Sequence, residues 1–191
     1  MSSDIFKIIS KRRTVKPANF TEQEIPEIIL REILESANWA PNHGRTEPWR
    51  LTVFSGAGRQ TFHDLIGKIY HQNPDVYPPE KLNKWQANAF LAPVIIAVGM
   101  KRTDGCKIPL VEELCAVAAA TQNLLLCAEA HGVCSYWGSS ISHLPGTAKE
   151  LGLDGKDDCI IGFIHLGYPK EEVHDGMRKS AIDDKITWIS E

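Results

Sequence analysis

The stretch from Pro109 to His131 is the sequence feature that most restricts how this chain can fold. It is rich in alanine and leucine around most of a helical circumference, and Gly132 ends it. A helix that is apolar all round has to be buried on all sides, and a chain of 191 residues has little material to surround one. We therefore expect a helix over Pro109–His131 that is either the central core helix or a helix at a subunit interface.

The same region is not expected to cross a membrane. Its apolar stretch, Leu114–Ala128, contains Thr121, Gln122 and Asn123, which makes it too short and too polar to span a bilayer. The N-terminus has no uninterrupted apolar segment of the kind found in secretory signals. An odd number of cysteines without a C-x-x-C pair is typical of reduced, buried thiols, so we expect a cytoplasmic protein. These cysteines are Cys106, Cys115, Cys127, Cys134 and Cys159.

Helices and strands alternate along the remaining chain. Helices are predicted at Asp4–Arg12, from near Glu24 to Ala40, and at Arg59–Tyr70, Glu80–Phe90 and Leu144–Leu151. Strands are predicted at Trp49–Phe54, Val94–Val98, Val133–Trp137 and Ile160–Leu166. Thr21 and Glu24 have the spacing of a capping box for the second helix, and the continuous apolar run at Val94–Val98 is typical of a strand covered on both faces. Without repeats or low-complexity segments, residues 1–191 are expected to form one layered helix/sheet/helix domain.

Composition and motifs exclude several classes of function. The net charge is -3, and the basic residues are scattered apart from Lys11–Arg13, so neither nucleic acid nor an anionic membrane is an expected partner. The chain lacks a phosphate-binding P-loop, a dinucleotide-binding glycine fingerprint and a serine-hydrolase elbow. Its seven histidines show no zinc-ligand spacing. We expect no metal site.

Three segments carry a recognisable set of residues in a fixed order. They are Arg12–Thr14, the loop from Ala40–His43 through Pro48–Trp49, and Gly162–Pro169. Together they resemble the FMN-dependent nitroreductase family, and the match is closest to its small bacterial branch. The resemblance extends from about residue 5 to 170 and includes Tyr136–Ser139. No single motif is specific for the family, but the combination of all of them in this order is much stronger evidence of the resemblance.

The resemblance implies a fold, a cofactor and an assembly. The fold is α+β, a three-layer helix/sheet/helix arrangement with a mixed, mainly antiparallel sheet, in an intertwined homodimer with two FMN sites between the subunits. The implied activity is a ping-pong transfer of hydride from NAD(P)H to small-molecule acceptors of the nitroaromatic or quinone type. Because the cofactor carries out the chemistry in such enzymes, no catalytic side chain is expected.

The basic segment at the end of the first predicted helix suits the anionic parts of FMN. An arginine side chain can bind a phosphate through two parallel hydrogen bonds, and a cation near the ring favours its reduction. We therefore expect Arg12, Arg13 and Thr14 to contact the cofactor. The alternative is a solvated basic helix end that is stabilised by the helix dipole.

Two further segments are expected at the cofactor because the resemblance places them there. Trp39 and His43 match positions that reach toward the flavin of the other subunit; core packing and simple solvation, respectively, are the alternatives. Trp137, Gly138 and Ser139 match a strand end beside the ring, with core packing as the alternative for the tryptophan. Close relatives can carry a bulkier, basic residue at the position of Gly138, which leaves the role of this glycine open.

Other aromatic side chains and the tail carry weaker expectations. Trp85 and Phe90 belong to a segment that covers the substrate side in similar proteins, although core packing is the better interpretation for each. Arg178 and Lys179 are candidate phosphate contacts in the tail. The apolar end around Trp188 is expected to pack on something, such as a partner subunit.

Two other functions remain open on the same residues. A relative of this fold can carry out different flavin chemistry, such as dehalogenation, flavin destruction or cyclodipeptide oxidation. The chain can also be a non-enzymatic flavin-binding or storage protein. The colour of the purified protein and its response to NADPH separate these alternatives.

Overall fold

The computed structural model describes residues 3–103, 105 and 107–190, so Cys106 lies outside the described residues. The longer helices are α1 (Asp4–Lys11), α2 (Glu27–Ala37), α3 (Gly58–Gln72), α4 (Pro79–Leu91) and α5 (Leu110–Ala130). The strands are β1 (Trp49–Ser55), β2 (Val94–Met100), β3 (Cys134–Gly138) and β4 (Cys159–Gly167). Short helical segments are η1 (Pro17–Asn19), η2 (His43–Arg45), α6 (Thr147–Glu150) and η3 (Asp183–Lys185). The predicted elements are confirmed in type and order.

The four strands form one sheet in the order β1-β2-β4-β3, and every neighbouring pair is antiparallel. A parallel bridge joins Thr14 to Ser135 outside the named strands. All seven residues of β2 are buried, which confirms a strand covered on both faces. The α+β architecture is as predicted, while parallel pairing within the described residues is limited to the bridge at Thr14.

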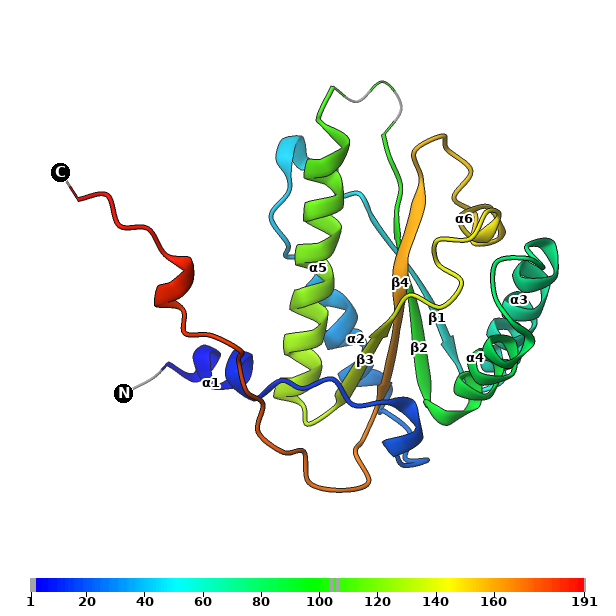
Figure 1. The fold of residues 1–191 in the computed structure, drawn as a ribbon, viewed down its shortest axis with the longest axis horizontal. Coiled ribbons are helices and arrows are strands. Elements are labelled where there is room, and N and C mark those ends of the chain that lie inside the picture. Colours follow the sequence, from blue (N-terminus) through cyan, green and yellow to red (C-terminus); the bar gives the residue numbers. More distant parts are fainter. Residues whose placement is uncertain (1–2, 104, 106, 191) are drawn as a thin grey trace.

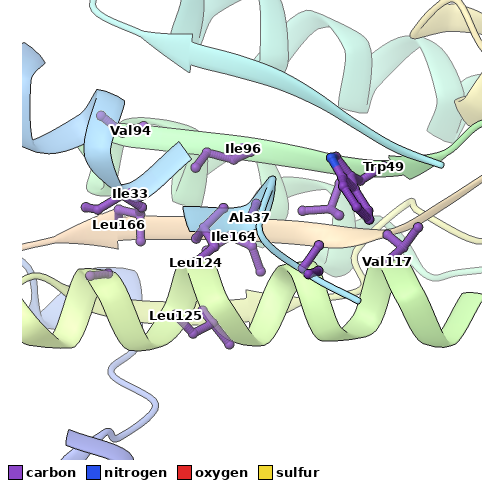
Figure 2. Packing of buried hydrophobic residues seen from close by; sticks show 14 of the residues in the cluster. Ile33, Ala37, Trp49, Val94, Ile96, Val117, Leu124, Leu125, Ile164 and Leu166 are labelled. Carbon is purple, nitrogen blue, oxygen red and sulfur yellow. The ribbon is translucent and has the colours of Figure 1, made fainter. Parts of the chain in front are cut away.

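Helices cover both faces of the sheet and create two apolar cores (Figure 1). On one face α2 and α5 pack against the strands, and Figure 2 shows Ile33, Leu124 and Ile164 among the side chains of this cluster. On the other face α3 and α4 enclose a second cluster around Phe62 and Phe163, whose rings lie 5.0 Å apart. The three-layer arrangement is therefore confirmed.

Helix α5 is buried along one stripe only. Ala116, Ala120 and Leu124 face α2 and the sheet at the spacing expected for one side of a helix. Val111 and Cys115, on another side, are exposed. The expectation that α5 is buried on all sides is therefore wrong for the single chain, and so is the expectation of buried thiols at Cys115. An apolar helix side left open in one chain is compatible with the second interpretation, a helix at a subunit interface.

The composition of α5 also corrects the membrane argument. Its 21 residues contain a window of mean hydropathy 1.4, long and apolar enough by these measures alone to cross a bilayer. The prediction that this segment is too short and too polar is therefore wrong. The apolar side chains on its buried stripe are accounted for by contacts with α2 and the sheet.

The second helix begins later than predicted. Pro26 occupies the position before the first turn in an extended conformation, so α2 starts at Glu27. The Thr21 hydroxyl instead accepts a hydrogen bond from the nearby Gln23 backbone N–H at 3.4 Å. The capping-box prediction at Thr21 and Glu24 is therefore wrong, because proline can begin a helix but cannot continue one from upstream.

Both ends of the chain extend away from the two cores (Figure 1). Helix α1 is amphipathic but has no buried residue, and Ile5, Phe6 and Ile9 are exposed. Every residue from 171 to 190 is exposed, including Trp188 and Ile189. Apolar side chains therefore remain uncovered at both ends of the chain.

Candidate functional site

The basic segment after α1 lies along the outer edge of the sheet. Helix α1 ends at Lys11, and the chain then runs beside β3, where the Val15 backbone N–H donates to the Ser135 carbonyl at 3.0 Å. Arg12 and Arg13 are half-buried in this position. The sheet edge therefore holds the predicted phosphate-binding residues in a fixed orientation.

Arg13 is the most enclosed side chain of the basic segment. Its guanidinium donates to the Ser10 carbonyl and lies under the tail, since a Cβ added at Gly176 would be 2.5 Å from Nη1. Its Nε is buried and has no hydrogen-bond partner among the described residues. A buried donor without a partner is costly, and a solvated helix end does not explain it. This N–H is available to an anionic or polar ligand.

Strand β3 ends in a segment with unusual backbone and packing. Trp137 is 41% exposed and its indole lies directly over Gly162, where an added Cβ would be 2.2 Å from Nε1. The core-packing alternative for Trp137 is therefore wrong. Ser140 has a left-handed backbone (φ 41°), and its hydroxyl is buried without a hydrogen-bond partner among the described residues. Such strain in a non-glycine residue is often found at binding sites.

The space beside Gly138 that a side chain would need is filled by the ring of Tyr136. A Cβ at Gly138 would lie 2.6 Å from Cε1 of Tyr136, so the tyrosine ring occupies the space that a larger residue would need. A basic residue at position 138 would therefore require Tyr136 to turn away. The size of the residue at position 138 and the orientation of Tyr136 are therefore coupled.

A pocket of about 240 Å³ opens between β3, β4 and α4. Its lining includes Tyr136, Gly138, Ser139, Ser140 and His165 from the strands and the segment after β3, with Phe62 from α3, and Tyr77, Lys81, Lys84, Trp85 and Asn88 from α4 and the segment before it. No residue of this lining is acidic. The pocket thus joins the end of β3 to a basic and aromatic wall.

His165 forms the floor of this pocket. Its ring lies parallel to Tyr136, with centroids 5.7 Å apart and an interplanar angle of 4°. Burial lowers the pKa of His165 to about 4, so the imidazole is neutral at neutral pH. Its Nδ1 is buried without a hydrogen-bond partner among the described residues. Residue identity alone gave little sign of this role, because a single histidine in an apolar strand is usually a core residue.

The wall of the pocket on the α4 side was only partly anticipated. Trp85 is half-buried and lines the pocket, whereas Phe90 is 47% exposed and does not, so the core interpretation of Phe90 is wrong. Lys81 and Lys84 were not predicted. Their spacing of three residues, which puts both on one side of a helix, was the signal available in the sequence.

Trp39 and His43 lie elsewhere: Trp39 follows the C-terminal end of α2, and His43 lies at the N-terminal end of α5. Trp39 is 79% exposed, with its indole donating to Glu35 at 3.1 Å, so core packing is wrong for it. The ring of His43 contacts the Glu112 carboxylate at 2.7 Å between Nδ1 and Oε2. These two side chains face outward from the single chain.

His43 and the basic segment therefore lie at opposite ends of α5. His43 contacts Glu112 in the first turn of α5, whereas the bridge from Thr14 reaches Ser135, just after the C-terminal end of that helix. A helix of 21 residues spans roughly 30 Å. One chain brings Arg12, Arg13 and Thr14 to the edge of the strand that leads to Trp137, Gly138 and Ser139, but it does not bring Trp39 and His43 there.

Comparisons with known proteins identify relatives over most of the chain. The model of the Nitroreductase family matches residues 9–168. A relative from Escherichia coli, named "Putative NAD(P)H nitroreductase YdjA", is 29% identical over 164 residues, which is 84% of each chain.

Two solved structures have the same fold. A nitroreductase-like family protein from Bacillus cereus is 27% identical, covers 99% of this chain with 97% of its own, and superposes with a TM-score of 0.83. A protein from Desulfovibrio desulfuricans, described as a "putative nitroreductase in complex with fmn", is 20% identical, covers 100% of this chain with 99% of its own, and has a TM-score of 0.76. With the family match extending over most of its length, this chain belongs to the nitroreductase family.

Proposed function

We propose that this protein is an FMN-dependent oxidoreductase that passes electrons from NAD(P)H to nitroaromatic or quinone-type acceptors. The observation that carries the proposal is the enclosed guanidinium of Arg13, whose buried Nε has no partner beside the edge of β3. The proposal is supported by family membership, by the name of the relative YdjA and by the FMN complex of the Desulfovibrio protein.

The residues present fit the chemical needs of FMN. Its phosphate needs cationic donors, and Arg12 and Arg13 provide them, with the Thr14 hydroxyl beside them. Its ring edge needs neutral hydrogen-bonding groups, and the unpartnered hydroxyl of Ser140 lies next to Ser139 and Gly138 at the end of β3. We propose that these residues hold the cofactor, with Trp137 beside the ring.

The protein's part in the reaction is to bind and orient. When bound, FMN supplies the redox chemistry, accepting a hydride from NAD(P)H and passing two electrons to the acceptor in a second half-reaction. Arg12 and Arg13 neutralise negative charge, and Tyr136 over Gly138 limits the space available beside the strand end. No side chain is proposed as a nucleophile or an obligatory acid.

We further propose that the active form is an intertwined homodimer. The separated site residues are united if each site combines Arg12–Thr14 of one subunit with Trp39 and His43 of the other. The exposed apolar side chains of α1 and of the tail around Trp188 supply surfaces for such an association. We also propose that residues 1–191 form one domain and that the protein is cytoplasmic.

Spectroscopy of the purified protein tests the function. A yellow protein that bleaches with NADPH under anaerobic conditions, and regains its colour with a nitroaromatic or a quinone, supports the oxidoreductase. A yellow protein that never bleaches would instead favour a flavin-binding or storage protein. A colourless protein that does not take up added FMN contradicts both.

A further inference from the structure

The pocket between β3, β4 and α4 has a charge opposite to that of the whole molecule. Lys81 and Lys84 line it and no acidic residue does, although the chain as a whole carries a net charge of -3. Among the described residues, neither lysine takes part in an ion pair. The two ammonium groups are therefore available to a negatively charged ligand.

The same wall presents aromatic surface in a fixed position. The Tyr77 hydroxyl and His143 Nε2 lie 2.7 Å apart in a hydrogen bond, and the Tyr77 carbonyl accepts from Tyr70, also at 2.7 Å. The rings of Tyr77 and Trp85 pack edge to face with centroids 5.0 Å apart. An aromatic wall that is held by its own contacts binds a flat ring with little loss of side-chain entropy.

A second, independent feature at the floor also indicates a ligand. His165 is 4% exposed, lines the pocket and has an Nδ1 without a partner among the described residues. Since burial keeps this imidazole uncharged at neutral pH, it offers a hydrogen bond without adding charge. The positive charge of the pocket therefore comes from the two lysines on α4, which lie one helical turn apart.

The size of the pocket limits what can enter it. Its volume of about 240 Å³ is below the roughly 300–1,000 Å³ typical of sites for drug-sized ligands. A single-ring molecule fits this space, whereas a whole dinucleotide does not. The pocket also reaches Gly138 and Ser139, where the proposed function puts the edge of the flavin ring.

We propose that this pocket binds the electron acceptor, and that the preferred acceptor is a single-ring aromatic compound with an anionic substituent. The ring packs against Tyr77 and Trp85, the negative group lies at Lys81 and Lys84, and the reducible group points toward Gly138 and Ser139. This inference rests on the proposed function and adds the charge of the substrate to it.

Steady-state kinetics of the FMN-loaded protein with two matched acceptors tests the inference. 4-Nitrobenzenesulfonate and 4-nitrobenzenesulfonamide have similar shapes but differ by one negative charge. The measured quantity is the ratio of their kcat/KM values in the wild type, in Lys81→Gln/Lys84→Gln and in Lys149→Gln. Lys149 lies exposed on α6, outside the pocket lining, so its variant controls for overall charge.

We expect the sulfonate-to-sulfonamide ratio to fall about three- to tenfold in the double variant, as estimated from two partly exposed ion pairs. It stays at the wild-type value in Lys149→Gln. The wild-type preference should also shrink as ionic strength rises from about 0.01 M to about 1 M, because the screening length falls from about 30 Å to about 3 Å.

Three results would overturn the inference. If the ratio is the same in all three proteins while both acceptors are reduced, the proposed function stands and the acceptor assignment is wrong. If the double variant loses FMN on dilution, the lysines belong to the cofactor site. If NADPH alone bleaches the double variant more slowly than the wild type, by the factor seen with the sulfonate, the lysines bind the phosphates of the donor. Failure to reduce either acceptor contradicts the proposed function itself.

Discussion

At the scale of single residues, unsatisfied polar atoms distinguish the candidate site from the rest of the molecule. Among the described residues, the buried side-chain atoms without partners are Arg13 Nε, Ser140 Oγ and His165 Nδ1. All three belong to the basic segment or to the pocket lining. Buried polar groups in folded proteins are nearly always paired, so these three atoms support the proposed ligand sites at the basic segment and in the pocket.

Arg13 provides a direct test of the phosphate site. Arg13→Ala should raise the Kd for FMN about tenfold or more, because a hydrogen bond between charged groups contributes about 1.5–3 kcal/mol; Arg12→Ala should act in the same direction. Quenching of FMN fluorescence during titration of the FMN-free protein measures this. Lys11→Ala removes an exposed neighbouring charge and is the control. Wild-type affinity in both arginine variants would contradict the assignment.

His165 predicts a pH dependence of stability. Because its pKa is about 4 in the folded protein against 6.5 for the unshifted group, the unfolded state takes up a proton first as the pH falls. Stability is therefore lost from about pH 6.5 down to about pH 4, by about 3 kcal/mol in total. Urea unfolding across this range should show a smaller loss for His165→Gln.

The matched control for this pH experiment is His71→Gln, which changes a histidine exposed at the end of α3. That variant should lose stability between pH 6.5 and pH 4 as the wild type does. Equal acid sensitivity of the His165 variant and the wild type would show that this imidazole is protonated without penalty, and its burial would then be irrelevant to stability.

At the scale of elements, the periodicity of the sequence predicted the type and order of helices and strands well, but it predicted their burial less well. The apolar run at Val94–Val98 correctly indicated a strand covered on both faces, because both sides of a central strand meet side chains of the same chain. The apolar circumference of α5 did not indicate complete burial, because Val111 and Cys115 face away from α2 and the sheet. Composition records what a helix can bury but not which molecule covers it.

The parts of the site that are continuous in sequence were predictable, whereas the parts that depend on packing between strands were not. Arg12–Thr14 and Trp137–Ser139 follow from motif order. The relation between Tyr136 and His165 follows from strand register, since these residues pair across β3 and β4. Without that register, neither the stacked rings nor the space above Gly138 can be read from the sequence.

The packing of α5 against α2 and the sheet should contribute strongly to the free energy of unfolding of the protein. Leu124 is fully buried between α5, α2 and the strands, so Leu124→Ala should lower the free energy of unfolding by about 2–5 kcal/mol. Ile28→Ala, at a side chain 75% exposed on α2, should change it by no more than about 0.5 kcal/mol. Chemical denaturation measures both. Similar small losses in the two variants would mean that this core is loosely packed.

At the scale of the whole molecule, both ends of the chain carry uncovered apolar side chains. Helix α1 has its apolar side exposed, and the tail beyond residue 170 is exposed throughout. A soluble monomer rarely leaves several large apolar side chains uncovered in this way. These exposed side chains therefore support the homodimer that we propose.

Helix α1 offers a test of that assembly. Phe6→Glu places a charge on the exposed apolar side of α1 and should shift the protein from dimer toward monomer, because burying an unpaired charge is costly. Light scattering after size-exclusion chromatography, over a range of concentrations, measures the change. Lys7→Gln alters the charge by the same amount on the polar side of the helix. A wild-type protein that is monomeric throughout would overturn the dimer.

The length of α5 has a consequence for genetics as well as for structure. If each cofactor site draws its arginines from one subunit and His43 from the other, co-expression of an Arg12→Ala/Arg13→Ala chain with a His43→Ala chain yields mixed pairs. In such a pair one site carries every lesion and the other carries none. Each mixed dimer of two defective chains would then bind about half of the normal amount of FMN. Subunits that each contain a complete site cannot complement one another in this way.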